Sequence, residues 1–74
     1  MKPSESQEGT VLRNRHTNGL FEILHFEIVE IHKVPFREVA VFTIQNLKTG
    51  MEGRWAGEFL DAHFVVQEGE HGNE

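Results

Sequence analysis

Hydrophobic side chains along the middle of the chain fall into short runs that alternate with polar side chains and are separated by turn residues. The clearest run, residues 39–46, is rich in valine, isoleucine and phenylalanine, and both of its faces are largely apolar as far as Thr43. Such a run predicts a central β-strand. Residues 46–50 follow with the composition of a type I turn closed by a glycine at positive φ. Residues 51–55 then predict a returning strand, in which Gly53 suggests a bulge or a close backbone approach.

Residues 20–33 have a pattern that fits two kinds of element. Leucine and isoleucine recur at helical spacing, and Asn18 precedes them as an N-cap would, which is typical of a helix. The same segment is enriched in β-branched and aromatic side chains, and Asn18-Gly19 supplies a hairpin turn directly before it. We adopt a long strand with a bulge or bend near residues 25–27, and a helix over residues 20–31 stays the open alternative.

Shorter segments complete the fold prediction. Residues 9–16 favour a short extended strand, and Pro35 ends the long strand because proline lacks the N–H that a central strand needs. Residues 56–64 fit one or two helical turns or a 3₁₀ segment before Val65 and Val66 close the domain. The sequence therefore predicts a mainly β fold: a small antiparallel sheet or SH3-like barrel of about four to five strands with one short helix.

The two ends of the chain differ in composition from its middle. Residues 1–8 and 67–74 are rich in Gly, Ser, Gln, Glu and Asn and nearly free of large apolar side chains, so we expect both to be disordered tails. Residues 9–66 form a single β-rich domain. The net charge is -5, and the C-terminal tail is acidic because it carries glutamates and no lysine or arginine. Such a tail mostly serves solubility.

The composition also narrows the class of protein. The chain has 74 residues and no cysteine, which excludes disulfides, thiol nucleophiles, iron–sulfur clusters and cysteine-based zinc sites. No apolar run follows the first lysine, and no stretch approaches the length of a membrane span. We therefore expect a soluble cytoplasmic protein that has no signal peptide, makes no membrane contact and is a monomer.

Patterns for catalysis and metal binding are weak. Imidazole is a good metal ligand, but His25 and His32 are seven positions apart and would face opposite sides of a regular strand. Asp61 and His63 are two positions apart and would not face each other on a helix. Both serines lie in the N-terminal tail, and the glycines form no phosphate-binding motif. We predict no enzyme activity, no cofactor and no metal site; a metal-dependent enzyme is the least favoured alternative.

Recognition of another protein is the function that this pattern favours. Arginine and aromatic side chains are enriched among interface anchors, and a small sheet offers strand edges to which a partner segment can add. The candidate protein-binding residues are Arg13, Arg15, Phe36, Arg37, Arg54 and Trp55. The alternative is a nucleic-acid-binding SH3-like β-barrel module. Direct nucleic-acid binding is the lesser hypothesis, because the middle of the chain has no excess of positive charge to contact phosphates.

Two resemblances bear on these hypotheses. The order of turn and strand residues in the chain is similar to that of small bacterial SH3-like β-barrel domains. The residues that carry this similarity are Arg15-His16, Asn18-Gly19, Phe21-Glu22-Ile23, Val39-Ala40-Val41-Phe42 and Gly53-Arg54-Trp55, followed by Phe59-Leu60. The profile of the whole chain resembles phage-encoded RNA-polymerase-binding antiterminators of the type found in a lytic phage of Xanthomonas oryzae. That profile consists of the start Met1-Lys2-Pro3-Ser4, a cysteine-free β core and the acidic end Glu68-Gly69-Glu70-His71-Gly72-Asn73-Glu74.

The second resemblance implies a partner and a mode of action. A regulator of this family binds the N-terminal region of the β′ subunit of host RNA polymerase, inhibits transcription initiation and allows read-through of terminators. A phage-encoded protein would do this in the cytoplasm of the host cell. The family offers no motif that can be matched position by position, so the resemblance assigns no binding residue in this chain.

Overall fold

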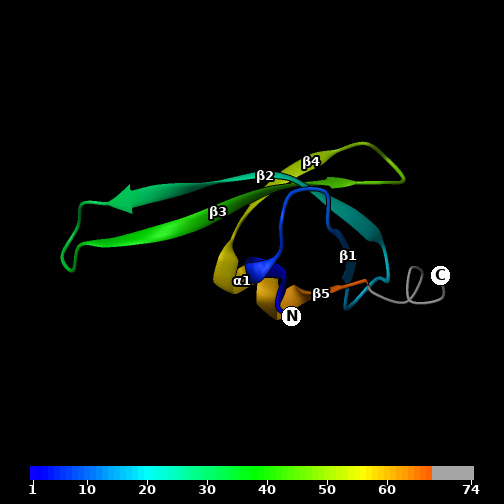
Figure 1. The fold of residues 1–74 in the computed structure, drawn as a ribbon, viewed down its shortest axis with the longest axis horizontal. Helices are drawn as coiled ribbons and strands as arrows, with labels where there is room; N and C mark the ends of the chain where they lie inside the picture. Colours follow the sequence, from blue (N-terminus) through cyan, green and yellow to red (C-terminus); the bar gives the residue numbers. More distant parts are fainter. Residues whose placement is uncertain (68–74) are drawn as a thin grey trace.

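A computed structural model describes residues 1–67 of the chain. The predicted acidic tail, residues 67–74, lies outside the described residues apart from Gln67. Five antiparallel strands form one sheet in the order β4-β3-β2-β1-β5, with a short α-helix between β4 and β5 (Figure 1). The elements are η1 (Pro3–Glu5), β1 (Val11–Asn14), β2 (Leu20–Ile31), β3 (Arg37–Asn46), β4 (Glu52–Ala56), α1 (Gly57–His63) and β5 (Phe64–Val66). The predicted mainly β fold with one short helix is confirmed.

The ambiguous segment is a strand. β2 pairs with β3 along its whole length, and the register shifts between Ile23 and His25, which places the irregularity at the start of the region where the sequence suggests one. Asn18 has a φ of 66° and Gly50 a φ of 80°, so each supplies the left-handed residue of its turn. Of the two alternatives for Gly53, the bulge is wrong, because Gly53 pairs with Ile44 in an unbroken register.

The sheet is strongly curled, and its concave side holds the core. Among the described residues, the buried hydrophobic cluster consists of Leu12, Ile23, Phe42, Ile44, Leu60 and Phe64. Trp55 of β4 packs edge-on against Phe64 of β5, with ring centroids 5.3 Å apart. Because β4 and β5 are the two outermost strands of the sheet, this contact brings its edges together. Leu60 of α1 fills the space between them. The curl thus gives a small domain a nearly closed core.

The N-terminal segment is ordered, unlike the disordered tail predicted for residues 1–8. Pro3–Glu5 forms the 3₁₀ helix η1, which packs on α1, and Pro3 and Ser6 are buried. The backbone N–H and the hydroxyl of Ser4 both donate hydrogen bonds to the carboxylate of Asp61, over 2.9 Å and 2.7 Å. A polar segment can therefore be held by a charge-assisted pair although it has few apolar side chains to bury. The domain begins close to the start of the chain rather than at residue 9.

A long β-hairpin projects from this compact part. β1 pairs with β2 only at residues 20–22, and β4 pairs with β3 only at residues 41–45. Beyond these points β2 and β3 continue together, as Figure 1 shows on its left side. The projecting part, residues 26–40, is called the arm below. It makes the molecule elongated, with principal extents of 46 × 25 × 21 Å.

Candidate protein-binding surface

The arm exposes large apolar side chains to solvent. Phe26 and Ile28 of β2 have exposed fractions of 46% and 55%. In the loop at the tip, Val34 is fully exposed and Phe36 is 60% exposed. Apolar side chains scattered singly over a surface are ordinary, but these belong to one projecting hairpin. The arm therefore gathers four of the large exposed apolar side chains of the described chain on one projecting element.

The pairing of β2 with β3 explains why these side chains are uncovered. Phe26 lies opposite Phe42 and stacks on it with centroids 5.3 Å apart, so the inner face of the arm continues the core. Ile28 lies opposite Ala40 on the same face, further out, where none of the described residues forms a second layer over it. Val29 and Val39 form an apolar pair on the other face. A two-stranded ribbon with both faces in water is marginally stable by itself.

The arm also has open strand edges. The outer edge of β2 has no strand beside it over residues 24–31, and the outer edge of β3 has none over residues 37–40, within the described part of the chain. An open edge presents backbone N–H and C=O groups in a row, to which an extended segment of another protein can add as a new strand. Hydrogen bonds between the main chains would align the partner strand with the arm, and the exposed side chains would determine which partner binds.

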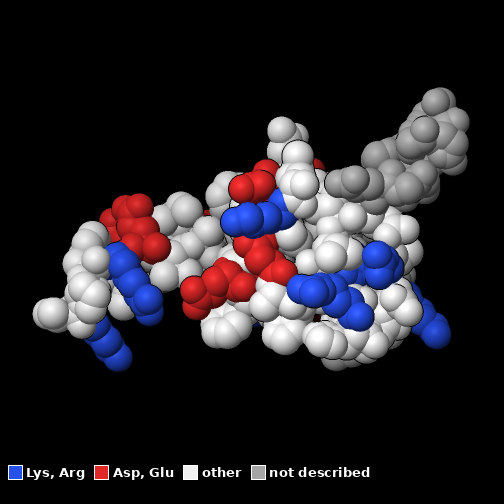
Figure 2. All heavy atoms as spheres, turned by 90° about the horizontal axis from the view of Figure 1, so that it is seen from below, with Lys and Arg blue, Asp and Glu red and all other residues white. Residues whose placement is uncertain are grey.

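Charged side chains at the outer end of the arm are arranged in separate groups. Glu30 lies directly opposite Glu38 in the β2–β3 register, a like-charge pair that destabilises the ribbon. His32 approaches the carboxylate of Glu30 at 3.3 Å. Lys33 and Arg37 flank the tip loop, and Figure 2 shows acidic and basic groups at this end side by side but not mixed. The tip therefore combines basic and apolar side chains.

The structure brings together only two of the six predicted binding residues. Phe36 and Arg37 are neighbours at the tip of the arm, where both are exposed, and the ring of Phe36 lies 5.4 Å from that of His32. Arg54 lies on β4, where its guanidinium pairs with the carboxylate of Glu27. Trp55 is half-buried against Phe64 and serves the core.

The remaining two predicted residues are engaged elsewhere in the domain. The Arg13 side chain donates to Gln67 Oε1 at 3.2 Å and to Asn18 Oδ1 at 3.3 Å. The Arg15 side chain donates to the carbonyl oxygen of Ala62 at 3.1 Å, at the end of α1. These two arginines hold the β1–β2 turn and the end of β5 in place, far along the chain from the tip of the arm. The predicted arginine–aromatic set is therefore divided between the tip and the compact part.

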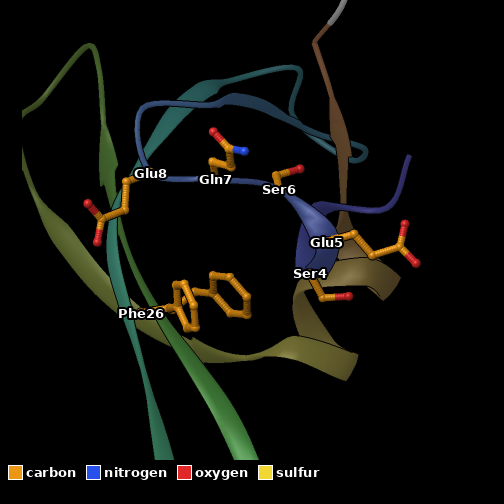
Figure 3. Close-up of a pocket in the computed structure, with 7 residues that line it drawn as sticks. Ser4, Glu5, Ser6, Gln7, Glu8 and Phe26 are labelled. Atoms are coloured by element: carbon orange, nitrogen blue, oxygen red, sulfur yellow. The ribbon is translucent and has the colours of Figure 1, made fainter.

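A hollow that no pattern in the sequence predicts lies at the base of the arm. It has a volume of about 610 Å³ and is open to solvent. Residues 4–8 of the N-terminal segment line one side, and Phe26 faces them from β2, as the close-up shows (Figure 3). Phe42 contributes the floor. The hollow exists because the N-terminal segment is ordered, so no local sequence pattern could indicate it. It places the exposed Phe26 of the arm opposite a polar wall formed by residues 4–8.

The described residues hold no cluster of three or more His, Asp or Glu side chains that could bind a metal ion. Two histidines do meet: Nε2 of His16 lies 3.2 Å from Nδ1 of His63. They are 47 positions apart, so spacing in the sequence gives no sign of the pair. Within residues 1–67, neither helical segment has the length and apolar character that crossing a bilayer requires.

Comparison of the chain with protein-family models, with curated proteins and with solved structures finds no match in any of the three. The surface therefore has to be interpreted from its own chemistry.

Proposed function

We propose that the protein acts by binding another protein through the arm, without catalysis. The observation that carries this proposal is the projecting hairpin itself, whose tip exposes Val34 and Phe36 and whose outer strand edges are open. Large apolar side chains gathered on an exposed hairpin with open strand edges are typical of a surface that a partner covers. Contact with a partner would also supply the second layer that stabilises the ribbon.

The energetics favour the tip as the anchor. Full burial of a valine or phenylalanine side chain contributes about 1.5–3 kcal/mol, so a few such residues dominate a small interface. Arg37, next to Phe36, can form hydrogen bonds with a carboxylate of the partner. Strand addition along the edge of β2 or β3 would fix the orientation of the two molecules.

For the identity of the partner, we propose the N-terminal region of the β′ subunit of bacterial RNA polymerase. The support is the resemblance of the whole chain to phage-encoded antiterminators, since the arm specifies an apolar and basic contact but no particular protein. In this proposal the protein acts stoichiometrically in the cytoplasm of the bacterial host, inhibiting promoter-dependent initiation and allowing read-through of terminators.

The alternative of a nucleic-acid-binding module receives less support from the side chains. Arg54 is paired with Glu27, while Arg13 and Arg15 are bonded within the domain. Like-charged glutamates, Glu30 and Glu38, lie across the arm. Phosphate recognition requires clustered cations and gives an affinity that falls steeply as salt rises. Strong salt-sensitive binding of the protein to naked RNA or DNA would promote this alternative over the proposal.

The test mixes the full chain with purified bacterial RNA polymerase and follows co-elution, promoter-dependent initiation and read-through at an intrinsic terminator. The double variant Val34→Ser/Phe36→Ser should bind at least about tenfold more weakly, because it removes two apolar anchors. Arg37→Glu should also weaken the complex. The matched control is Leu47→Ser, which changes a similarly exposed apolar side chain in the β3–β4 turn and should leave binding unchanged.

Two outcomes would contradict different parts of the proposal. If the wild-type protein neither co-elutes with polymerase nor alters either activity at excess concentration, the proposed partner is wrong. If it binds polymerase but the arm variants bind equally well, the arm is not the contact surface. Circular dichroism of each variant shows that a loss of binding is not a loss of fold.

A further inference from the structure

Two histidine side chains meet at the end of the molecule away from the tip of the arm. His16 lies in the turn between β1 and β2, and His63 is the last residue of α1. The backbone fixes both: the N–H of Arg15 donates to the carbonyl oxygen of His63 at 2.8 Å, and the N–H of His16 donates to Asn14 Oδ1 at 2.8 Å. The two rings are thus held as neighbours by bonds that do not involve the rings.

The geometry of the ring nitrogens is that of a chelating pair. Nε2 of His16 and Nδ1 of His63 lie 3.2 Å apart, with the ring planes tilted by 52°. Metal–nitrogen bonds of 2.0–2.1 Å at square-planar to tetrahedral angles separate two nitrogens by about 2.8–3.4 Å. The distance between these two nitrogens therefore falls within the range that one metal ion can bridge. Without metal, one ring donates a hydrogen bond to the other.

We propose that His16 and His63 form a surface site for a divalent transition-metal ion of the class that prefers imidazole, namely Cu²⁺, Ni²⁺ or Zn²⁺. Affinity should follow the general order in which copper exceeds nickel and zinc. Asp61, the nearest carboxylate along the chain, is occupied by Ser4, so water or an added ligand completes the coordination. The bound ion would tie the β1–β2 turn to the end of α1.

The surroundings of the pair set the limits of this site. His16 is exposed and His63 half-buried, so the ion has direct access from solvent. The guanidinium of Arg15, bonded to the carbonyl oxygen of Ala62, is the nearby positive charge and lowers the affinity. The site is separate from the arm, so it neither requires nor disturbs the proposed binding of a partner protein.

The single tryptophan of the chain provides a reporter. The ring of Trp55 lies 5.7 Å from that of His63. Cu²⁺ is paramagnetic and quenches indole fluorescence at short range. Titration of the full chain with Cu²⁺ at about neutral pH should give saturable quenching with a stoichiometry of one ion per chain.

Single substitutions locate the site. His16→Gln and His63→Gln should each weaken copper binding at least about tenfold, because the second imidazole of a chelating pair binds as an intramolecular ligand. The matched control is His25→Gln/His32→Gln, which removes two exposed histidines of β2 and the arm loop. The variant His71→Gln removes the histidine beyond the described residues. Both controls should bind copper as the wild type does.

A second readout separates chelation from a structural role of the rings. Nitrogen-15 spectra of the histidine rings should show Zn²⁺-induced shifts at His16 Nε2 and His63 Nδ1, and Zn²⁺ should raise the melting temperature of the wild type but of neither single variant. The absence of saturable quenching at excess Cu²⁺ would overturn the proposal. So would equal binding by the His16→Gln variant, or loss of binding in His71→Gln.

Discussion

Ser4 and Asp61 form the polar contact that fixes the N-terminal segment to the domain. Their two hydrogen bonds end on one carboxylate in a partly buried position, where bonds to a charged group contribute more than neutral ones. We expect Asp61→Ala to lower the free energy of unfolding by about 2–3 kcal/mol and Ser4→Ala by about 1–2 kcal/mol. Urea unfolding followed by tryptophan fluorescence measures both values.

The matched control for this contact is Glu58→Ala. Glu58 is an exposed acidic residue on the same helix, and its removal should change the stability by no more than about 0.5 kcal/mol. An effect of Asp61→Ala as small as that of Glu58→Ala would show that residues 1–8 are detached in solution, as the sequence composition predicts.

Several residue contacts could not be predicted because their partners are remote in the chain. Ser4 and Asp61 are 57 positions apart, and His16 and His63 are 47 apart. The composition of residues 1–8 indicates a disordered N-terminus, because the segment has few apolar side chains. Composition contains no information on a carboxylate elsewhere in the chain that accepts two hydrogen bonds from the segment. Phe36 and Arg37, by contrast, are adjacent in the sequence and both exposed at the tip of the arm, and their role in binding stays a prediction.

At the scale of elements, the arm is the least supported part of the sheet. Within the described part of the chain, residues 28–31 and 37–40 pair only with each other, and Glu30 faces Glu38 across the ribbon. Replacing Glu38 by Lys converts this repulsion into an opposite-charge pair, which should stabilise the arm by about 0.2–1 kcal/mol. Native-state hydrogen exchange, followed by NMR at the amides of the arm, should slow accordingly, while the exchange of core amides in β3 should not change.

The control for the arm is Glu52→Lys, which makes the same change of charge on β4. Glu52 is exposed and lies opposite Gln45, so no like-charge pair is relieved. Exchange in the arm should be unaltered in this variant. Equal slowing in both variants would mean that net charge, and not the Glu30–Glu38 pair, sets the stability of the arm.

The elements were largely predictable, and their exposure was not. The β-branched run of residues 39–46 and the turn at residues 46–50 carry their own local signals, and both are found as β3 and its turn. The strand β2 was distinguishable from a helix mainly by the Asn18-Gly19 turn before it. The alternation of apolar and polar residues along a strand does not show whether other elements cover the apolar face of the sheet. Ile28 therefore has the sequence pattern of a core residue, although it is exposed on the arm.

At the scale of the whole molecule, the closure of the curled sheet depends on a few large side chains. Leu60 of α1 is fully buried among residues of several strands, next to the contact of Trp55 with Phe64. Leu60→Ala should cost about 2–5 kcal/mol, a large share of the stability of a domain this small. Leu60→Val keeps most of the volume and should cost about 1 kcal/mol.

The neighbouring Phe59 provides the control for this cost, because it lies on the same helix and is larger but 54% exposed. Phe59→Ala should change the unfolding free energy by less than Leu60→Val does, since it leaves no cavity in the core. Chemical denaturation followed by circular dichroism ranks the three variants. If Phe59→Ala were as damaging as Leu60→Ala, α1 would pack through its other face, and the closure of the sheet by Leu60 would be wrong. The expected ranking instead follows from burial: Leu60 is fully enclosed in the core cluster, whereas more than half of the Phe59 side chain is already exposed to solvent.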